Sequence, residues 1–114
     1  MSAEQQMVKQ FIATSLWTHE AEDIDVDEIP QDLKDKTLKV CEEFLQSIGE
    51  AAFDYDITDL GHDLMLTGAG HGAGFWDGDY PIHGDFFCEK TEPLKDEIVD
   101  IDDEIYMWVE GYMA

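Results

Sequence analysis

Residues 61–77 read GHDLMLTGAGHGAGFWD, and this stretch decides the fold class that the sequence predicts. The run from Asp63 to Thr67 predicts a short strand, and Phe75 and Trp76 begin a second one. Between them, residues 68–74 consist only of glycine, alanine and histidine, which is typical of a tight turn because glycine adopts backbone conformations that other residues avoid. The stretch therefore predicts a β-hairpin at the centre of the chain.

Helices are expected on the N-terminal side of this hairpin. Apolar residues at helical spacing favour a helix over residues 5–18, although a strand over residues 11–17 competes for the same segment. The clearest helix begins at Pro30, since proline is favoured in the first turn, and Gly49 and the loop after it end the helix near residue 51. Its apolar face comprises Leu33, Leu38, Cys41, Phe44, Leu45 and Ile48.

On the C-terminal side, the pattern predicts a loop over residues 78–90, a short helix over residues 92–100 and a final strand over residues 104–110. No internal repeat or change of composition divides the sequence. We therefore expect a single domain of residues 1–114 in the α+β class. Two N-terminal helices would pack on a small antiparallel sheet that contains the central Gly/His-rich β-hairpin.

The charge of the chain is its most unusual property. Twenty-eight aspartates and glutamates face six lysines and no arginine, which gives a formal net charge of −22 at pH 7. Hydrophobic residues still make up 44% of the sequence and aromatics 11%, so a packed core is expected, unlike in a disordered acidic tail. Self-repulsion at this charge opposes folding. Three explanations stay open: a surface that only keeps the protein soluble, halophilic adaptation, and imitation of a polyanion by carboxylates.

Two acidic clusters stand out, residues 20–28 and 96–104, each with six acids in nine positions. The first is expected to be a solvated loop. The predicted second helix adds Asp32, Asp35, Glu42 and Glu43, at a spacing that suits a track of phosphate-like charges and equally suits an ordinary solvated face. Trp76, Tyr80 and Tyr106 are candidate aromatic anchors for a partner. The residues expected to act as phosphate surrogates are Asp23, Asp25, Asp27, Glu28, Asp100, Asp102, Asp103 and Glu104.

Other kinds of site have weaker support. The glycines of residues 68–74 lack the following helix and the lysine that a phosphate-binding loop needs. Histidines and aspartates gather between His62 and Asp85, but without the spacing of a zinc or calcium site. Cys41 lies on an apolar helix face and Cys88 has no cationic neighbour, so neither is an expected nucleophile. No catalytic residue, metal or cofactor is predicted, and the chain is not expected to be an enzyme.

The surroundings of the protein are expected to be cytoplasmic. No apolar stretch approaches the ~18 residues of a membrane span, and the N-terminal residues lack the apolar core of a signal peptide. Two cysteines in such a chain are expected to be reduced thiols. An anionic membrane surface would repel this protein.

The stretch from Gly61 to Asp77 resembles the signature of a family of small, functionally uncharacterised phage and prophage proteins, which reads roughly GHDFWLTRNGHGAGFWDR. Residues 11–20 and 104–109 are similar to that family's N-terminal segment and final strand. The resemblance implies a phage-encoded protein that acts in the cytoplasm of a bacterial host, and it brings no established activity. Two arginines of the family pattern are replaced by Gly68 and Gly78, and its aromatic pair by Leu64 and Met65.

Two functions are compatible with these observations. The first is a DNA mimic that inhibits a host nucleic-acid-binding protein (restriction, CRISPR or another defence protein) by occupying its basic DNA-binding groove. The alternative is a small binding module whose Gly/His hairpin recognises a host protein or ligand, with the acidity serving only solubility. Direct nucleic-acid binding is not expected, and a homodimer stays open. The motif residues that would define this hairpin in the fold or carry its recognition are His62, Asp63, His71, Trp76 and Asp77.

Overall fold

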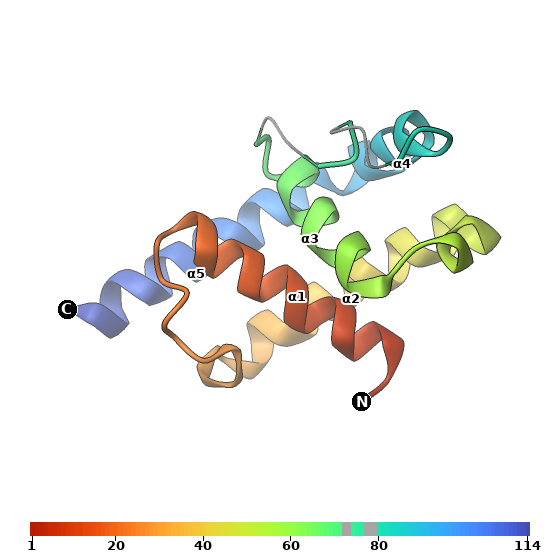
Figure 1. Ribbon diagram of the computed structural model, residues 1–114. Helices are drawn as coiled ribbons and strands as arrows, with labels where there is room; N and C mark the ends of the chain where they lie inside the picture. The colour runs from red at the N-terminus through yellow and green to blue at the C-terminus, as the bar shows by residue number, and fades with distance from the viewer. Residues whose placement is uncertain (72–73, 77–79) are drawn as a thin grey trace.

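The computed structural model describes residues 1–71, 74–76 and 80–114, and every regular element in them is a helix (Figure 1). In chain order, the elements are α1 (Ala3–Thr18), the 3-10 turn η1 (Val26–Glu28), α2 (Gln31–Ile48), η2 (Gly49–Asp54), α3 (Ile57–Gly68), α4 (Gly84–Thr91), η3 (Glu92–Leu94) and α5 (Lys95–Met113). The described part of the chain contains no strand. The predicted α+β class, with its antiparallel sheet and central hairpin, is therefore wrong, and the fold is all-α.

The predicted first strand of the hairpin, Asp63 to Thr67, lies inside α3. This helix begins at Asp56, whose carboxylate accepts a hydrogen bond from the backbone N–H of Thr58 at 2.9 Å. From residue 60 to 68 every residue except His62 is buried, because α1, α4 and α5 pack around the helix. A helix buried on all sides has no periodic polar face, so its sequence resembles that of a buried strand.

The predicted final strand, residues 104–110, is also helical. It continues from the predicted helix at residues 92–100, and together they form η3 and the 19-residue helix α5. Four buried residues spaced by three or four positions hold α5 to the core: Ile98, Ile101, Ile105 and Val109. The β-branched and aromatic residues of this segment favour a strand only weakly, and packing against the neighbouring helices overrides that preference. The loop predicted over residues 78–90 is wrong for residues 84–90, which are seven of the eight residues of α4.

The two N-terminal helices are confirmed. Helix α1 replaces the competing strand and begins with a capping box, in which Ser2 Oγ accepts from the Gln5 N–H at 3.1 Å and Gln5 Oε1 accepts from the Ser2 N–H at 2.9 Å. Helix α2 follows Pro30 directly and ends at Gly49, whose φ of 59° is readily adopted by glycine. Both helices were placed from the sequence alone because their apolar residues recur at helical spacing and because Pro30 and Gly49 mark the ends of α2.

Glycines of the central motif allow the helices to approach closely. A Cβ atom at Gly61 would lie 2.6 Å from the carbonyl oxygen of Met7 in α1. A Cβ atom at Gly68 would overlap the side chain of Ile98 in α5. Gly68 is one of the positions where the resembling family pattern has arginine, and here the packing against Ile98 leaves no room for a longer side chain. Gly61 and Gly68 therefore allow α3 to pack against both α1 and α5.

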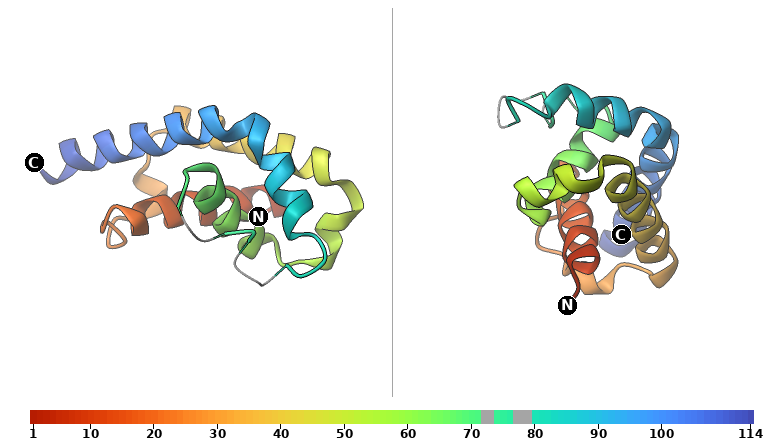
Figure 2. Two further views of the ribbon diagram at one scale, coloured as in Figure 1. Left: turned by 90° about the horizontal axis from the view of Figure 1, so that it is seen from above. Right: turned by 90° about the vertical axis from the view of Figure 1, so that its right-hand side faces the viewer.

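The interior is completed by an aromatic cluster beside α2 and α4. The rings of Phe44 and Phe75 stack with centroids 5.4 Å apart, and Phe87 packs edge-on to both. The radius of gyration of 13.3 Å is close to the ~13 Å expected for a folded domain of about 100 residues. The molecule measures 44 × 29 × 23 Å, and the last turns of α5 project past the end of α1 (Figure 2).

The two free thiols are expected to differ in reactivity. Burial raises the pKa of Cys41 to about 12, whereas Cys88 is only half-buried, with a pKa raised by burial and by Asp85. Because the thiolate is the reactive form, iodoacetamide at about pH 8 should label Cys88 slowly and Cys41 only after unfolding in urea. Mass spectrometry of the intact and digested protein checks this. Rapid labelling of Cys41 in native protein would contradict the packing of α2.

Candidate functional site

The exposed face of α5 carries a row of carboxylates. At about 100° per residue, its members fall within an arc of about 140°, opposite the buried isoleucines of the same helix. From the first member to the last the helix rises about 21 Å, so its six members, which are separated by five intervals, follow one another every ~4.2 Å on average. One strand of B-DNA carries a phosphate every ~3.4 Å of helix axis. This α5 row consists of the exposed residues Asp96, Glu97, Asp100, Asp103, Glu104 and Glu110.

Asp102 does not belong to this row, although the sequence placed it among the phosphate surrogates. Its side chain turns toward α1, and the residue is only 9% exposed. Its Oδ1 accepts a hydrogen bond from Ser15 Oγ at 2.6 Å and lies 2.9 Å from His19 Nε2. The carboxylate of Asp102 therefore joins α5 to α1 and is not available to a partner.

The first acidic cluster lies on the loop between α1 and α2. Asp23, Asp25, Asp27 and Glu28 are all exposed, and the buried side chains on either side of them anchor the loop to the core. The Asp25 carboxylate accepts a hydrogen bond from the Asp27 N–H at 2.9 Å, and the hydroxyl of Tyr112 donates to Glu28 at 2.6 Å. The loop is thus held in place both locally and by the end of α5.

The α5 row approaches the start of α2. A shallow hollow of about 310 Å³ separates the start of α2 from α5, and Asp32, Asp103 and Glu104 lie around it. The Tyr112–Glu28 hydrogen bond joins the loop to the last turn of α5. We call this region the acidic surface; it comprises the α5 row together with Asp23, Asp25, Asp27, Glu28 and Asp32.

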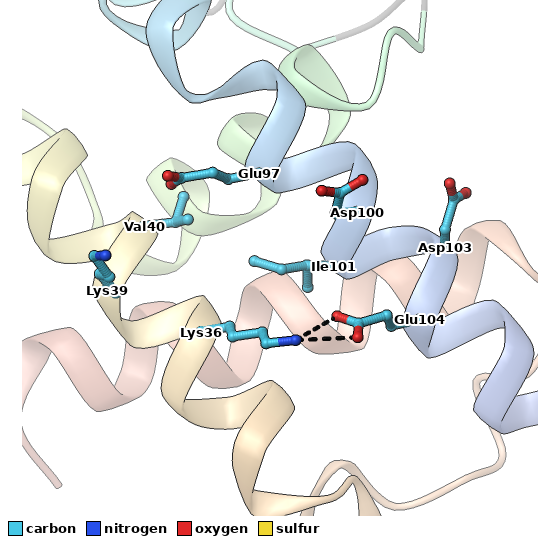
Figure 3. A pocket seen from close by; sticks show the side chains of 8 residues that line it. All are labelled: Lys36, Lys39, Val40, Glu97, Asp100, Ile101, Asp103 and Glu104. Atoms are coloured by element: carbon cyan, nitrogen blue, oxygen red, sulfur yellow. Dashed lines mark hydrogen bonds and ion pairs between the residues drawn. The ribbon is translucent and has the colours of Figure 1, made fainter.

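Helix α2 does not provide a second track of acids. Three of the six lysines of the chain lie on it, and two of them, Lys36 and Lys39, share the outer face with the predicted acids. Lys36 Nζ donates to both carboxylate oxygens of Glu104 at 3.0 Å (Figure 3). This hydrogen bond raises the pKa of Lys36 above its usual value, so the ammonium group stays charged. The outer face of α2 is therefore of mixed charge.

A groove of about 510 Å³ runs between α2 and α5. Ile101 points into the space between the helices, and Val40 lies across from it, both deeply buried (Figure 3). The Lys36–Glu104 pair spans the groove from one wall to the other. The residues that line this α2–α5 groove are Lys36, Lys39, Val40, Glu97, Asp100, Ile101, Asp103 and Glu104.

Met107 is an apolar side chain within the α5 row, and it was not found from the sequence. It is 67% exposed and lines the hollow next to Asp103 and Glu104. The strand predicted over residues 104–110 separated it from the acids that precede it. Treating residues 95–113 as one helix would have placed Met107 in the middle of the acidic face. The Lys36–Glu104 pair was not predicted either, because it depends on how α2 and α5 pack against each other.

The motif residues do not gather at one surface. His62 Nδ1 lies 2.8 Å from Thr14 Oγ1, and buried Asp63 accepts a hydrogen bond from Tyr80 at 2.6 Å. Tyr80 is buried as well, so it is not an exposed anchor, whereas Tyr106 is exposed beside His19. His71 and Trp76 are exposed between α3 and α4, and Asp77 lies outside the described residues. His62 and Asp63 therefore contribute contacts within the fold.

Within residues 1–71, 74–76 and 80–114, no three histidine, cysteine, aspartate or glutamate side chains are grouped so that they could hold a metal ion. The helices of these segments include none that is both long and apolar enough to cross a membrane. Comparison of the chain with models of protein families, with curated proteins and with solved structures found no match.

Proposed function

We propose that this chain is a phage-encoded DNA mimic that inhibits a nucleic-acid-binding protein of a bacterial host, such as a restriction, CRISPR or other defence protein, by occupying its DNA-binding surface. The α5 row carries the proposal, because its six exposed carboxylates follow the helix axis at an average interval of ~4.2 Å, which is of the same order as the ~3.4 Å between the phosphates of one DNA strand. A protein that binds the DNA backbone presents lysines and arginines at matching intervals. The bacterial origin of the target rests on the resemblance of residues 61–77.

The rigidity of the acidic surface supports this proposal. The α5 row stands on a helix whose opposite face is buried in the core, and the loop acids are held by the Tyr112–Glu28 and Asp25–Asp27 hydrogen bonds. Charges fixed in advance lose little conformational entropy when a partner binds. The net charge of −22 adds long-range attraction to a basic partner, which speeds association and makes it sensitive to salt.

The alternative function, recognition through a Gly/His hairpin, is not proposed. It required a hairpin, and the segment that was to form its first strand is part of helix α3. Gly61 and Gly68 pack against α1 and α5, and Asp63 is buried against Tyr80. These contacts favour a role of the motif in holding the helices together.

We expect neutralisation of four of the six members of the α5 row to weaken inhibition strongly. The immobilised chain is exposed to nuclease-treated bacterial lysate, and the proteins that bind to it are eluted with duplex DNA. The DNA binding of these eluted proteins is then measured with and without the chain. The row variant should be at least tenfold weaker as an inhibitor, equivalent to about 1.4 kcal/mol of binding free energy. It carries the changes Asp96→Asn, Asp100→Asn, Asp103→Asn and Glu110→Gln.

The control removes the same amount of charge from residues outside the acidic surface. All four of its positions are exposed, and the changes are Glu42→Gln, Glu50→Gln, Asp54→Asn and Glu89→Gln. We expect the control to inhibit within about threefold of the unmodified chain, since its loss of charge acts only at long range. The proposal fails if DNA elutes no protein that the chain inhibits, or if both variants weaken inhibition equally.

A further inference from the structure

We propose that the α2–α5 groove receives an α-helix of the partner that carries arginine or lysine along one face, and that Lys36 occupies the position of a ligand cation in the free protein. This inference rests on the proposed function, because both require a basic partner. It goes further by assigning the contact to one groove and by naming the secondary structure of the bound segment.

The shape of the groove fits a helix. It adjoins the hollow beside Met107, because Asp103 and Glu104 line both. From Glu97 to Met107, α5 rises about 15 Å, which is almost three helical turns. The two walls belong to two helices, and a third helix laid along them would make the kind of helix-in-groove contact that amphipathic peptides use.

The charges along the groove have a helical period. Glu97, Asp100 and Glu104 follow one another at intervals of three and four residues on the α5 wall. Basic residues at the same intervals on a second helix would face them in register. The exposed Met107 offers an apolar contact in the adjoining hollow, whereas Val40 and Ile101 are 2% exposed and lie at the buried floor of the groove. A partner helix with basic residues beside an apolar residue therefore complements this groove in charge and in polarity.

Lys36 shows how a cation is held there. Its ammonium group reaches across from α2 and donates to both oxygens of Glu104. Both side chains are about half exposed, and exposed ion pairs of this kind contribute little to stability. An arginine offers a carboxylate two parallel N–H donors, which a lysine ammonium group does not. A ligand arginine would therefore replace Lys36 at Glu104, and Lys36 acts as a weak internal competitor.

The experiment measures binding of a synthetic 18-residue helical peptide with arginines at positions i, i+3 and i+7 and leucines on the adjoining face. Fluorescence anisotropy at about 0.15 M salt compares the unmodified chain with Lys36→Gln and with Lys9→Gln. Lys9 is exposed on α1 beside a different hollow, so both variants change the net charge equally. We expect Lys36→Gln to bind the peptide at least threefold tighter than Lys9→Gln does, and Met107→Ala to bind it more weakly than the unmodified chain.

Three outcomes would overturn the inference. Equal gains from Lys36→Gln and Lys9→Gln would show that only the total charge matters. Equal or tighter binding of a proline-containing peptide of the same charge would show that the bound segment is not a helix. A dimer in sedimentation that the peptide dissociates would show that a second copy of the chain fills the groove. None of these results changes the outcome of the inhibition experiment with the α5 row variant. Evidence against helix binding in the groove is therefore distinguishable from evidence against the proposed function.

Discussion

Replacement of Gly61 by alanine is expected to lower the free energy of unfolding by about 2 kcal/mol. The new methyl group would lie 2.6 Å from the carbonyl oxygen of Met7 and 3.2 Å from its Cγ. The first of these atoms belongs to the backbone, so the clash is relieved only if α1 moves away from α3. Overpacking costs up to about 3 kcal/mol, and the better helix propensity of alanine offsets about 1 kcal/mol of that.

The same substitution at Gly111 should have the opposite effect. Gly111 lies in α5, and no atom of the described residues lies within 4 Å of its ideal Cβ position apart from its own local backbone. Alanine there gains helix propensity without a clash and should stabilise the protein by up to about 1 kcal/mol. Urea unfolding followed by far-UV circular dichroism at constant salt measures both variants. Stabilisation by both changes would contradict the close packing of α3 on α1.

The part of the fold that could be predicted from the sequence depends on signals within a few residues. Pro30 and Gly49 mark the two ends of α2, and the apolar residues between them recur at the helical period. One face of α2 meets water and the other meets the core, so the period is visible. Helix α1 has a similar pattern, although its N-terminal capping box was not recognised.

Helix α3 and the second half of α5 were not predicted, and a different feature of the sequence concealed each of them. Helix α3 is enclosed by α1, α4 and α5, and its run of buried residues from Leu64 to Gly68 shows neither a helical nor a strand period. In α5 the helical spacing from Ile98 to Val109 was present, but the alternation within residues 104–110 concealed it. Whether such a segment becomes a strand or a helix depends on which neighbours it packs against, and those neighbours are distant in the sequence.

The candidate site could be predicted in composition but not in arrangement. Acid density alone identified the clusters at residues 20–28 and 96–104. Their division into exposed and buried members requires the helix, since α5 points Asp103 to solvent and turns Asp102 toward Ser15. The Lys36–Glu104 pair joins residues 68 positions apart, and no local signal contains that information.

Asp102 and Asp103 are adjacent in the sequence, but replacement by alanine should lower stability at Asp102 and weaken binding at Asp103. Asp102→Ala removes the acceptor of the buried Ser15 hydroxyl and the partner of His19. A buried donor without its acceptor costs about 1 to 3 kcal/mol, so we expect a loss of about 2 kcal/mol in the free energy of unfolding. Asp103 is exposed and accepts no hydrogen bond that supports the fold among the described contacts, so Asp103→Ala should stay within about 0.5 kcal/mol of the unmodified chain.

Peptide binding should be affected in the reverse order, with the larger loss for Asp103→Ala and the smaller for Asp102→Ala. Asp103 lines both the groove and the hollow beside Met107, so Asp103→Ala should weaken binding of the arginine-bearing helical peptide several-fold. Asp102 faces α1, so Asp102→Ala should bind the peptide like the unmodified chain when measured well below its unfolding temperature. Each variant loses one negative charge from adjacent positions of α5, and long-range attraction therefore cannot distinguish them. Equal losses of binding would mean that the acidic surface acts only through its total charge, whereas the expected difference would assign recognition to the exposed side of α5.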